Sequence, residues 1–214
     1  DHHGHVARLK GAMNALGLDG SKLDVVLMQL VELVRDGKPV RMSKRTGKAI
    51  TLTDLLEEVP IDAARFFFNM REPNTHLIFD LDLAVEQSSQ NPVYYVQYAH
   101  ARICSILKSL AAEGIAPAGE IPAGVLKEPE ELALVSCIAA FPSELKESAR
   151  LYDPARITKY AVDIASAFHK FYNACRCRCE DEQLMQARIS LCLAAKTTIK
   201  NVLTVLNISV PESM

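Results

Sequence analysis

The stretch that decides the fold is Asn91-Pro92-Val93-Tyr94-Tyr95-Val96-Gln97-Tyr98-Ala99-His100-Ala101-Arg102. We expect it to open a helix that runs from Pro92 to about Ala112. Tyr95, Tyr98 and Arg102 follow one another at i, i+3 and i+7, so they share one face of that helix. Two phenol rings and a guanidinium on one face can stack unpaired bases and hold a phosphate. The alternative is a helix that packs against its neighbours through its tyrosines. The residues left for the core are Val96, Ala99 and Ile103.

From Val93 onward the pattern predicts helices only, separated by short loops. Asp153-Pro154 is typical of a helix start, with a capping residue followed by proline at the first helical position. Pro142 is expected to separate two helices, because proline lacks the N–H that a helix interior needs. Five helices with short loops indicate a bundle in which each buries one face. Their expected ranges are 92–112, 128–140, 142–151, 154–177 and 180–207.

The preceding part mixes helical and strand signals, and we expect it to be a separate unit that ends near residue 85. The apolar run from Leu23 to Val34 suits a buried strand, and Asp36-Gly37 suits a hairpin turn before a returning strand at 38–42. Thr51-Leu52-Thr53-Asp54 resembles a capping box. Arg65 is expected to pair with Asp62 or Glu58, and Asp80-x-Asp82 is a weak cation signal. The expected helices cover 6–16, 51–59 and 61–71, and 72–91 is expected to be a connector.

Composition sets broad limits on the class of protein. The 214 residues are 49% hydrophobic and carry a formal net charge of −2, which favours a folded, soluble protein that binds nucleic acid only through local patches. No apolar run is long enough to span a membrane, and no secretory signal is visible. The six cysteines are expected to be reduced thiols, as in the cytoplasm. C-x-C-x-C at 175–179 does not match common zinc spacings. A start at Asp rather than Met suggests a fragment or a processed chain.

The stretch from Lys38 to Lys48 holds five cations in eleven residues, and no acid lies between Asp36 and Asp54. A cationic loop of this kind suits a polyphosphate, because Lys and Arg can follow charge that develops during phosphate chemistry. The alternative is a solvated basic turn. Asp1-His2-His3-Gly4-His5 could bind a metal ion, and a remnant of an affinity tag would look the same.

Four blocks of the sequence and its carboxyl end resemble one family. Arg41-Met42-Ser43-Lys44-Arg45 resembles the signature loop of class I aminoacyl-tRNA synthetases, in the form of the arginine-specific branch. Asp1-His2-His3-Gly4 is similar to a segment of arginyl-tRNA synthetases that ends a Rossmann strand near the ATP ribose and adenine. The run 94–102 resembles the opening of their anticodon-binding bundle, and 168–176 resembles a later helix of it. The ending 210–214 resembles the end of the family, with Ser213 in place of the usual arginine.

The resemblance implies a mainly α fold. A remnant of a Rossmann-type catalytic domain, with a short β-hairpin and connector helices, would occupy 1–85, and an all-α anticodon-binding bundle 86–214. It also implies an arginine–tRNA ligase that uses ATP, with Mg²⁺, to activate L-arginine and transfer it to tRNA. Lys44, Arg41 and Ser43 would stabilise the charge on the departing pyrophosphate. The residues implied for ATP are Asp1, His2, Gly4, Met42 and Lys44, and those implied for tRNA are Tyr95, Tyr98, Arg102, Tyr172 and Met214.

The resemblance also bears on metal binding, location, oligomeric state and the activity of this chain alone. The resemblance implies a cytoplasmic protein without a structural metal, and we expect a monomer that binds neither DNA nor membrane. The His-x-Gly-His-type motif that works with the signature loop is absent from these residues, so this chain alone is not expected to aminoacylate tRNA. The alternatives are another class I synthetase, such as the cysteine enzyme, and a non-catalytic helical module that binds RNA or protein.

Overall fold

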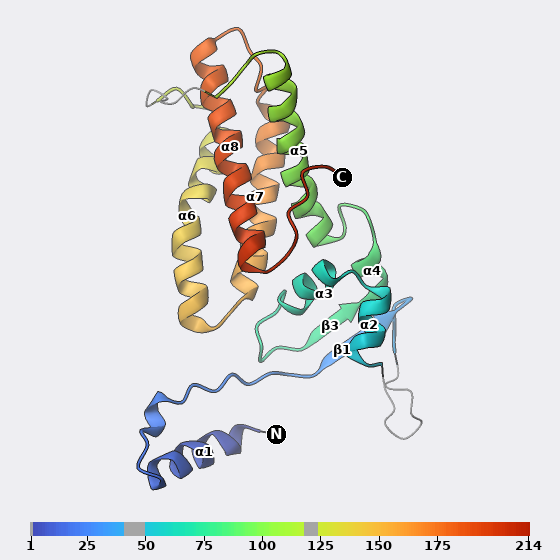
Figure 1. Ribbon diagram of the computed structural model, residues 1–214, viewed down its shortest axis with the longest axis vertical. Coiled ribbons are helices and arrows are strands. Elements are labelled where there is room, and N and C mark those ends of the chain that lie inside the picture. Colours follow the sequence, from blue (N-terminus) through green and yellow to red (C-terminus); the bar gives the residue numbers. More distant parts are fainter. Residues whose placement is uncertain (1, 41–49, 118–123) are drawn as a thin grey trace.

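Four long helices form the main body of the computed structural model, which describes residues 2–40, 50–117 and 124–214. They are α5 (Pro92–Ala112), α6 (Pro129–Leu151), α7 (Ala155–Ala174) and α8 (Glu182–Val205). Figure 1 shows them side by side, with α6 and α7 joined by a short turn. The mainly α fold expected from the sequence is confirmed. The bounds of α5 agree with the prediction, and α8 is slightly shorter than predicted at both ends.

Side-chain caps explain where the bundle helices begin. The Asn91 side chain accepts a hydrogen bond from the backbone N–H of Val93 (3.2 Å), with Pro92 at the first helical position. The Asp153 carboxylate accepts one from the N–H of Ala155 (3.0 Å), as the Asp153-Pro154 pair predicted. Each cap satisfies one of the N–H groups that a helix start leaves without an intrahelical partner.

The prediction of two helices on either side of Pro142 is wrong. One helix, α6, continues through Pro142, so the described bundle has four helices rather than five. A proline inside a helix costs about 3 kcal/mol in a lost hydrogen bond and a steric clash. Both halves of α6 nevertheless pack on the core: Leu134 is fully buried before the proline, and Leu145 packs against the core after it. The Phe141 ring lies 5.5 Å from that of Tyr160.

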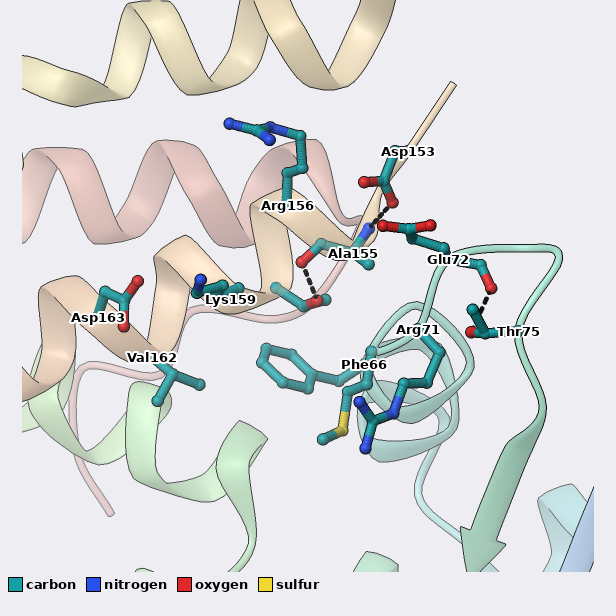
Figure 2. Close-up of a pocket in the computed structure, with 12 residues that line it drawn as sticks. Phe66, Arg71, Glu72, Thr75, Asp153, Ala155, Arg156, Lys159, Val162 and Asp163 are labelled. Carbon is teal, nitrogen blue, oxygen red and sulfur yellow. Dashed lines mark hydrogen bonds between the residues drawn. The ribbon is translucent and has the colours of Figure 1, made fainter. Parts of the chain in front are cut away.

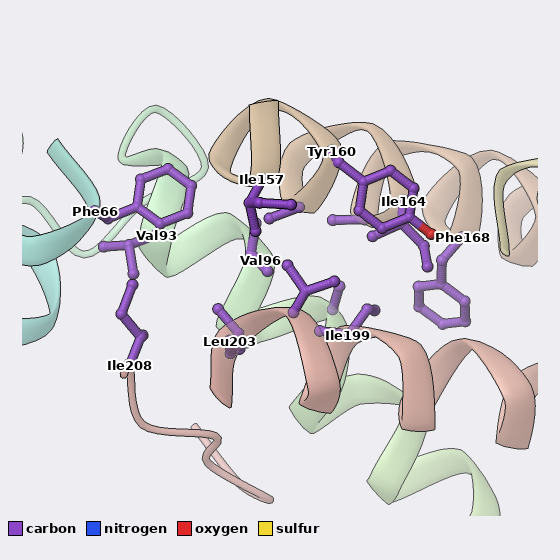
Figure 3. Packing of buried hydrophobic residues seen from close by; sticks show 14 of the residues in the cluster. Phe66, Val93, Val96, Ile157, Tyr160, Ile164, Phe168, Ile199, Leu203 and Ile208 are labelled. Atoms are coloured by element: carbon purple, nitrogen blue, oxygen red, sulfur yellow. The ribbon is translucent and has the colours of Figure 1, made fainter. Parts of the chain in front are cut away.

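The core fills the space between α5, α7 and α8 and continues toward the preceding segment. Figure 3 shows Phe168 of α7 and Ile199 of α8 in the bundle, and Phe66 of α3 (Ile61–Phe68) near Val93 and Ile208. Burying each of these side chains contributes roughly 1.5–3 kcal/mol. The bundle therefore shares one continuous apolar cluster with α3.

The preceding segment contains a three-stranded sheet of order β2-β1-β3. Its strands are β1 (Val31–Arg35), β2 (Lys38–Pro39) and β3 (Leu77–Asp80). The hairpin at Asp36 and Gly37 is confirmed: these residues have φ of 51° and 68°, as a tight hairpin turn requires. β3 pairs in parallel with β1, and α2 (Leu52–Glu58) and α3 lie between them in the chain.

One prediction for this segment is wrong. Residues 23–30 are not a strand, and Met28 and Leu30 are 76% and 87% exposed. A buried strand needs partners and cover on both faces, and within the run 23–34 only 31–34 pairs with β3. The connector 72–91 holds β3 and the short helix α4 (Leu81–Val85).

The polar residues of this segment have structural partners. Thr51 and Asp54 form the predicted capping box at the start of α2. Asp80 caps α4, and the carboxylate of Asp82 accepts from the N–H of Asp36 (2.6 Å), so both aspartates act within the fold. Arg65 has a structural partner, but not the expected one: it donates to the carbonyl oxygen of Asn207 (2.8 Å).

The first helix, α1 (His3–Ala15), lies apart from the bundle in Figure 1 and has no buried residue. Its range is close to the predicted one. A single turn of 3-10 helix (Gly20–Lys22) follows and contacts α1. No helix in the described ranges combines the length and the apolar character needed to cross a membrane.

Candidate nucleic-acid interface

An open groove of about 950 Å³ runs between α5 and α7. Tyr98 and Arg102 line it from α5, Tyr172 from α7, and Met214 from the last residues of the chain. We call it the α5–α7 groove. Four of the five residues predicted to bind tRNA thus come together in space, although 116 residues separate the first from the last.

Arg102 is held between two tyrosines. Its Nη1 donates a hydrogen bond to the hydroxyl of Tyr98 (2.8 Å). Its guanidinium carbon lies 4.6 Å from the centroid of the Tyr172 ring and 5.8 Å from that of Tyr98, within the range of cation–π attraction. Hydrogen bonding to the hydroxyls of Tyr172 and Tyr98 raises the pKa of Arg102 despite its partial burial. The guanidinium is therefore fixed and charged, with N–H groups left for an anion.

Tyr98 rests on His169 and remains partly open to solvent. The two ring centroids are 6.0 Å apart at 26°, and 36% of Tyr98 is exposed. Burial lowers the pKa of His169, and the nearby charge of Arg102 lowers it further, so the imidazole is neutral at pH 7. The exposed part of an aromatic ring that is held in place by its neighbours can stack a base.

Tyr95 does not line the groove. It is half-buried, its ring lies 4.9 Å from that of His169, and its hydroxyl donates to the Oγ of Ser166 (3.3 Å). The i, i+3 spacing from Tyr98 is as predicted, but Tyr95 is turned further toward α7. In this geometry Tyr95 supports His169, which in turn supports Tyr98.

Sequence reasoning missed two arginines at the groove, Arg176 and Arg178. The prediction carried α7 to about residue 177, whereas the helix ends at Ala174 and Cys175 has extended backbone angles. Beyond the helix end, residues 175–178 alternate between buried and exposed. The alternation of cysteine and arginine at 175–179 could have indicated that both arginines face solvent. The cysteines turn inward and the arginines outward. Arg178 forms an ion pair with Glu113 of the same groove (2.7 Å).

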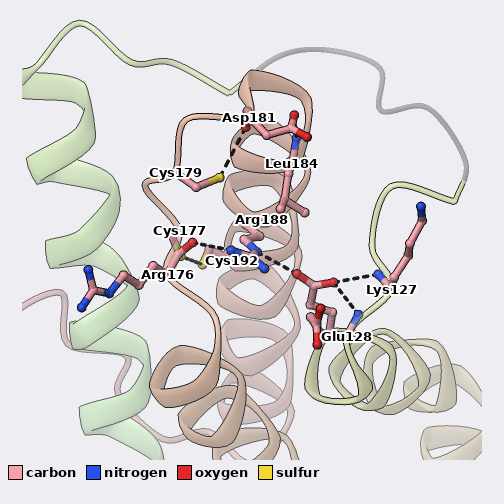
Figure 4. A network of polar contacts seen from close by, with 10 residues as sticks. Lys127, Glu128, Arg176, Cys177, Cys179, Asp181, Leu184, Arg188 and Cys192 are labelled. Atoms are coloured by element: carbon pink, nitrogen blue, oxygen red, sulfur yellow. Dashed lines mark hydrogen bonds and ion pairs between the residues drawn. The ribbon is translucent and has the colours of Figure 1, made fainter.

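A buried ion pair anchors the backbone of this segment (Figure 4). Arg188 of α8 donates through Nε to Glu131 of α6 (2.7 Å) and through Nη1 to the carbonyl oxygen of Arg176 (2.7 Å). The other Glu131 oxygen accepts from the backbone N–H of Lys127 (2.8 Å) and of Glu128 (3.0 Å). The network joins α6 and α8 to the loop that presents Arg176 to the groove.

The residues predicted for catalysis and ATP binding are mostly not described. Arg41, Met42, Ser43, Lys44 and Asp1 lie outside the described residues. His2 precedes α1 and Gly4 lies within its first turn, and both are exposed.

The described cysteines are free thiols, and the Sγ atoms of Cys177 and Cys192 are 3.6 Å apart. Among the residues with assigned positions, no group of three or more His, Cys, Asp or Glu side chains is arranged to hold a metal ion.

A second cavity, of about 610 Å³, lies between α3 and the start of α7 (Figure 2). Its charged lining consists of three basic and three acidic residues: Arg71, Arg156 and Lys159, and Glu72, Asp153 and Asp163. Because the charges are mixed, its chemistry does not favour an anion as the α5–α7 groove does.

Comparisons with known proteins agree with this geometry. The family model described as a DALR anticodon binding domain matches residues 96–214, which include all the groove residues named above. The chain is 56% identical over its whole length to the arginine–tRNA ligases of Caldanaerobacter subterraneus and Ruminiclostridium cellulolyticum, and spans 38% of the length of each.

Solved structures show the same fold. An arginyl-tRNA synthetase structure from Campylobacter jejuni superposes with a TM-score of 0.84 at 30% identity, covering 100% of this chain and 46% of that one. The Thermus thermophilus arginyl-tRNA synthetase gives a TM-score of 0.76 at 24% identity, covering 98% of this chain and 39% of that one. Since the family model matches more than half of the sequence, the chain belongs to the family of DALR anticodon-binding domains.

Proposed function

We propose that this chain is the C-terminal portion of an arginine–tRNA ligase and that its α5–α7 groove binds the anticodon region of arginine tRNA. The observation that carries the proposal is the 56% identity to arginine–tRNA ligases across the whole chain. The alternatives of a cysteine enzyme and of a non-catalytic module have no comparable support among these relatives.

Each residue of the groove is suited to a different kind of contact with RNA. Tyr98 and Tyr172 supply aromatic faces for unpaired bases, which a loop of tRNA presents and a duplex does not. Arg102 supplies a fixed cation for a phosphate between those bases, and Arg176 adds an exposed cation nearby. Met214 adds an apolar, adaptable contact. Tyr95 contributes indirectly, through His169.

The catalytic part of the proposal concerns the whole protein. Lys44, Arg41 and Ser43 would stabilise the pyrophosphate that leaves when ATP and L-arginine form the adenylate. Asp1, His2, Gly4 and Met42 would contact ATP. Mg²⁺ would accompany ATP and supply charge neutralisation, and no structural metal is proposed. We also propose a division at residue 85, a monomer, a cytoplasmic location and no arginylation by this chain alone, which spans 38% of its relatives' length.

The proposal is tested by binding of arginine tRNA to the Tyr98→Ala variant. Stacking one base on an aromatic ring is worth about 1–3 kcal/mol, so we expect the Kd to rise about tenfold or more. The matched control is Tyr152→Ala, which removes an exposed tyrosine at the far end of α6 and α7. This control is expected to bind like the unsubstituted chain.

The informative comparison is between arginine tRNA and the same tRNA with a changed anticodon. The unsubstituted chain should prefer the former, and Tyr98→Ala should reduce that preference. Circular dichroism must show that the helices are retained. If Tyr98→Ala weakens binding of both tRNAs equally, the groove does not recognise the anticodon. If Tyr98→Ala and Tyr152→Ala give equal Kd values, the groove is not the tRNA-binding site.

A further inference from the structure

The last nine residues, 206–214, which we call the tail, turn back from α8 and run along α5 (Figure 1). Ile208 is buried against the core and its N–H donates to the carbonyl oxygen of Leu203 (2.9 Å). From there the tail crosses toward the α5–α7 groove, where Ser213 and Met214 line one side. The position of this part of the groove therefore depends on what holds the tail.

The first attachment is at Ser209. Its N–H donates to the carboxylate of Asp62 on α3 (3.2 Å), and its hydroxyl also donates to that carboxylate. Gln97 of α5 donates through Nε2 to the carbonyl oxygen of Ser209 (3.0 Å) and to Asp62 (3.0 Å). Three segments that are distant in sequence meet here, but Ser209 is still four residues away from Ser213.

The second attachment is at His100, one turn further along α5 from Gln97. Nδ1 of His100 lies 2.8 Å from the carbonyl oxygen of Pro211. Since a carbonyl oxygen only accepts, Nδ1 carries the proton and donates it. Within the described ranges this is the last hydrogen bond of the tail before the groove. Beyond it there is only the ion pair of the exposed Glu212 with Lys196 (3.6 Å).

The surroundings of His100 fit a residue that holds the tail. Only 1% of it is exposed, and its Nε2 is buried without a hydrogen-bond partner among the described residues. A leucine would fill the same space without leaving a polar atom unpaired, so packing does not require histidine here. What histidine adds is the donor at Nδ1, which faces the tail.

We propose that His100 is a positioning residue that fixes the tail at Pro211 and thereby keeps Ser213 and Met214 at the side of the α5–α7 groove. The inference rests on the proposed function for its effect on tRNA binding. Its structural part, the placement of Met214, is independent of RNA and can be measured alone.

The structural part is tested by NMR of the chain labelled with ¹³C at its methionine methyl groups. Asparagine at position 100 can place a side-chain N–H near the site of Nδ1, whereas leucine cannot. In His100→Leu the Met214 methyl signal should shift toward that of a mobile methionine and narrow, and in His100→Asn it should stay near its original place. The other methionines serve as internal controls for folding. An unchanged Met214 signal in His100→Leu, with or without RNA, would overturn the proposal.

The functional part is tested by a double-mutant cycle with a chain that lacks Ser213 and Met214. His100→Leu should weaken binding of arginine tRNA about threefold to tenfold, as expected for loss of one net hydrogen bond. The truncation should weaken it at least as much. If His100 acts through the tail, His100→Leu should have no further effect in the truncated chain.

The outcomes separate this inference from the proposed function. Additive effects of His100→Leu and the truncation would mean that His100 acts elsewhere, and would overturn the inference while the function stands. No binding of arginine tRNA by the unsubstituted chain would overturn the proposed function and the functional part together. His100→Asn should retain most of the affinity, and equal losses for Asn and Leu would count against the donor role.

Discussion

Replacing Glu131 by glutamine is expected to destabilise the bundle by about 3 kcal/mol, because Glu131 is fully buried and neutralises the largely buried Arg188. Its carboxylate accepts three hydrogen bonds, from Arg188 and from the backbone N–H groups of Lys127 and Glu128. Glutamine keeps one accepting oxygen and places an amide NH₂ where the other was. Breaking one partner of a buried pair costs about 3–5 kcal/mol, and the retained acceptor puts the expected value at the lower end.

The dependence on pH follows from the pKa of Glu131. Burial alone would raise this pKa, but hydrogen bonds from Arg188 and the two backbone N–H groups more than offset that effect and leave it below 4.5. A carboxyl whose pKa is lowered by folding stabilises fully above its unfolded pKa and loses that contribution as the pH falls through its folded pKa. The difference between the unsubstituted chain and Glu131→Gln should therefore be full at pH 7 and shrink below about pH 4.

The assay is urea unfolding followed by circular dichroism at pH 7 and again at acidic pH. In a thermal melt of the same samples, a loss of about 3 kcal/mol corresponds to a fall in Tm of roughly 6–12 °C. Glu147→Gln is the matched control: it lies on the same helix and pairs with Arg150, but in solvent, so it should leave the unfolding midpoint nearly unchanged. If Glu131→Gln changes the free energy of unfolding by less than about 1 kcal/mol, or by the same amount at both pH values, the buried pair of Glu131 and Arg188 does not stabilise the fold as argued.

Three further variants probe Arg102 of the groove and Lys44 of the Arg41–Arg45 stretch. Arg102→Ala should weaken tRNA binding and reduce the slope of log K against log salt by about 0.7–0.9, whereas Arg102→Lys should keep the slope and lose the contact with Tyr172. A filter-binding salt series checks this, and an unchanged slope for Arg102→Ala would show that no phosphate is held there. In the full-length protein, Lys44→Ala should lower the rate of adenylate formation by about 10²-fold with little change in arginine affinity. Pyrophosphate exchange measures the rate of adenylate formation, and an unchanged kcat would contradict the catalytic role proposed for Lys44.

Local signals in the sequence predicted the helices well where caps define them. Asn91-Pro92, Asp153-Pro154 and the Thr51–Asp54 box each mark a helix start, and each is found there. The proximity of two groove residues was predictable from the helix pattern, whereas Tyr172 and Met214 were expected beside them only through the resemblance to arginyl-tRNA synthetases. Tyr98 and Arg102 are four residues apart on one helix, so their proximity follows from helix geometry alone.

The failures all depend on partners far away in the chain. Pro142 is typical of a helix end, but α6, which packs on α7, continues through it. The run 23–30 is as apolar as a buried strand, but no strand pairs with it among the described residues. The contact from Arg65 to Asn207 spans 142 residues, and no local pattern predicts such a partner.

The order in which the chain is made gives the position of α8 a further consequence. α8 supplies one wall of the core, including Ile199 and Leu203, yet it is the last of the four bundle helices to leave the ribosome. At about 5–20 residues per second, α5 exists for roughly ten seconds before α8 is complete. During that time the apolar face of α5, with Val96 and Ile103, lacks its final cover. Nascent chains that stop before α8 would thus display this face to chaperones and proteases, and none of them would carry the Met214 side of the groove.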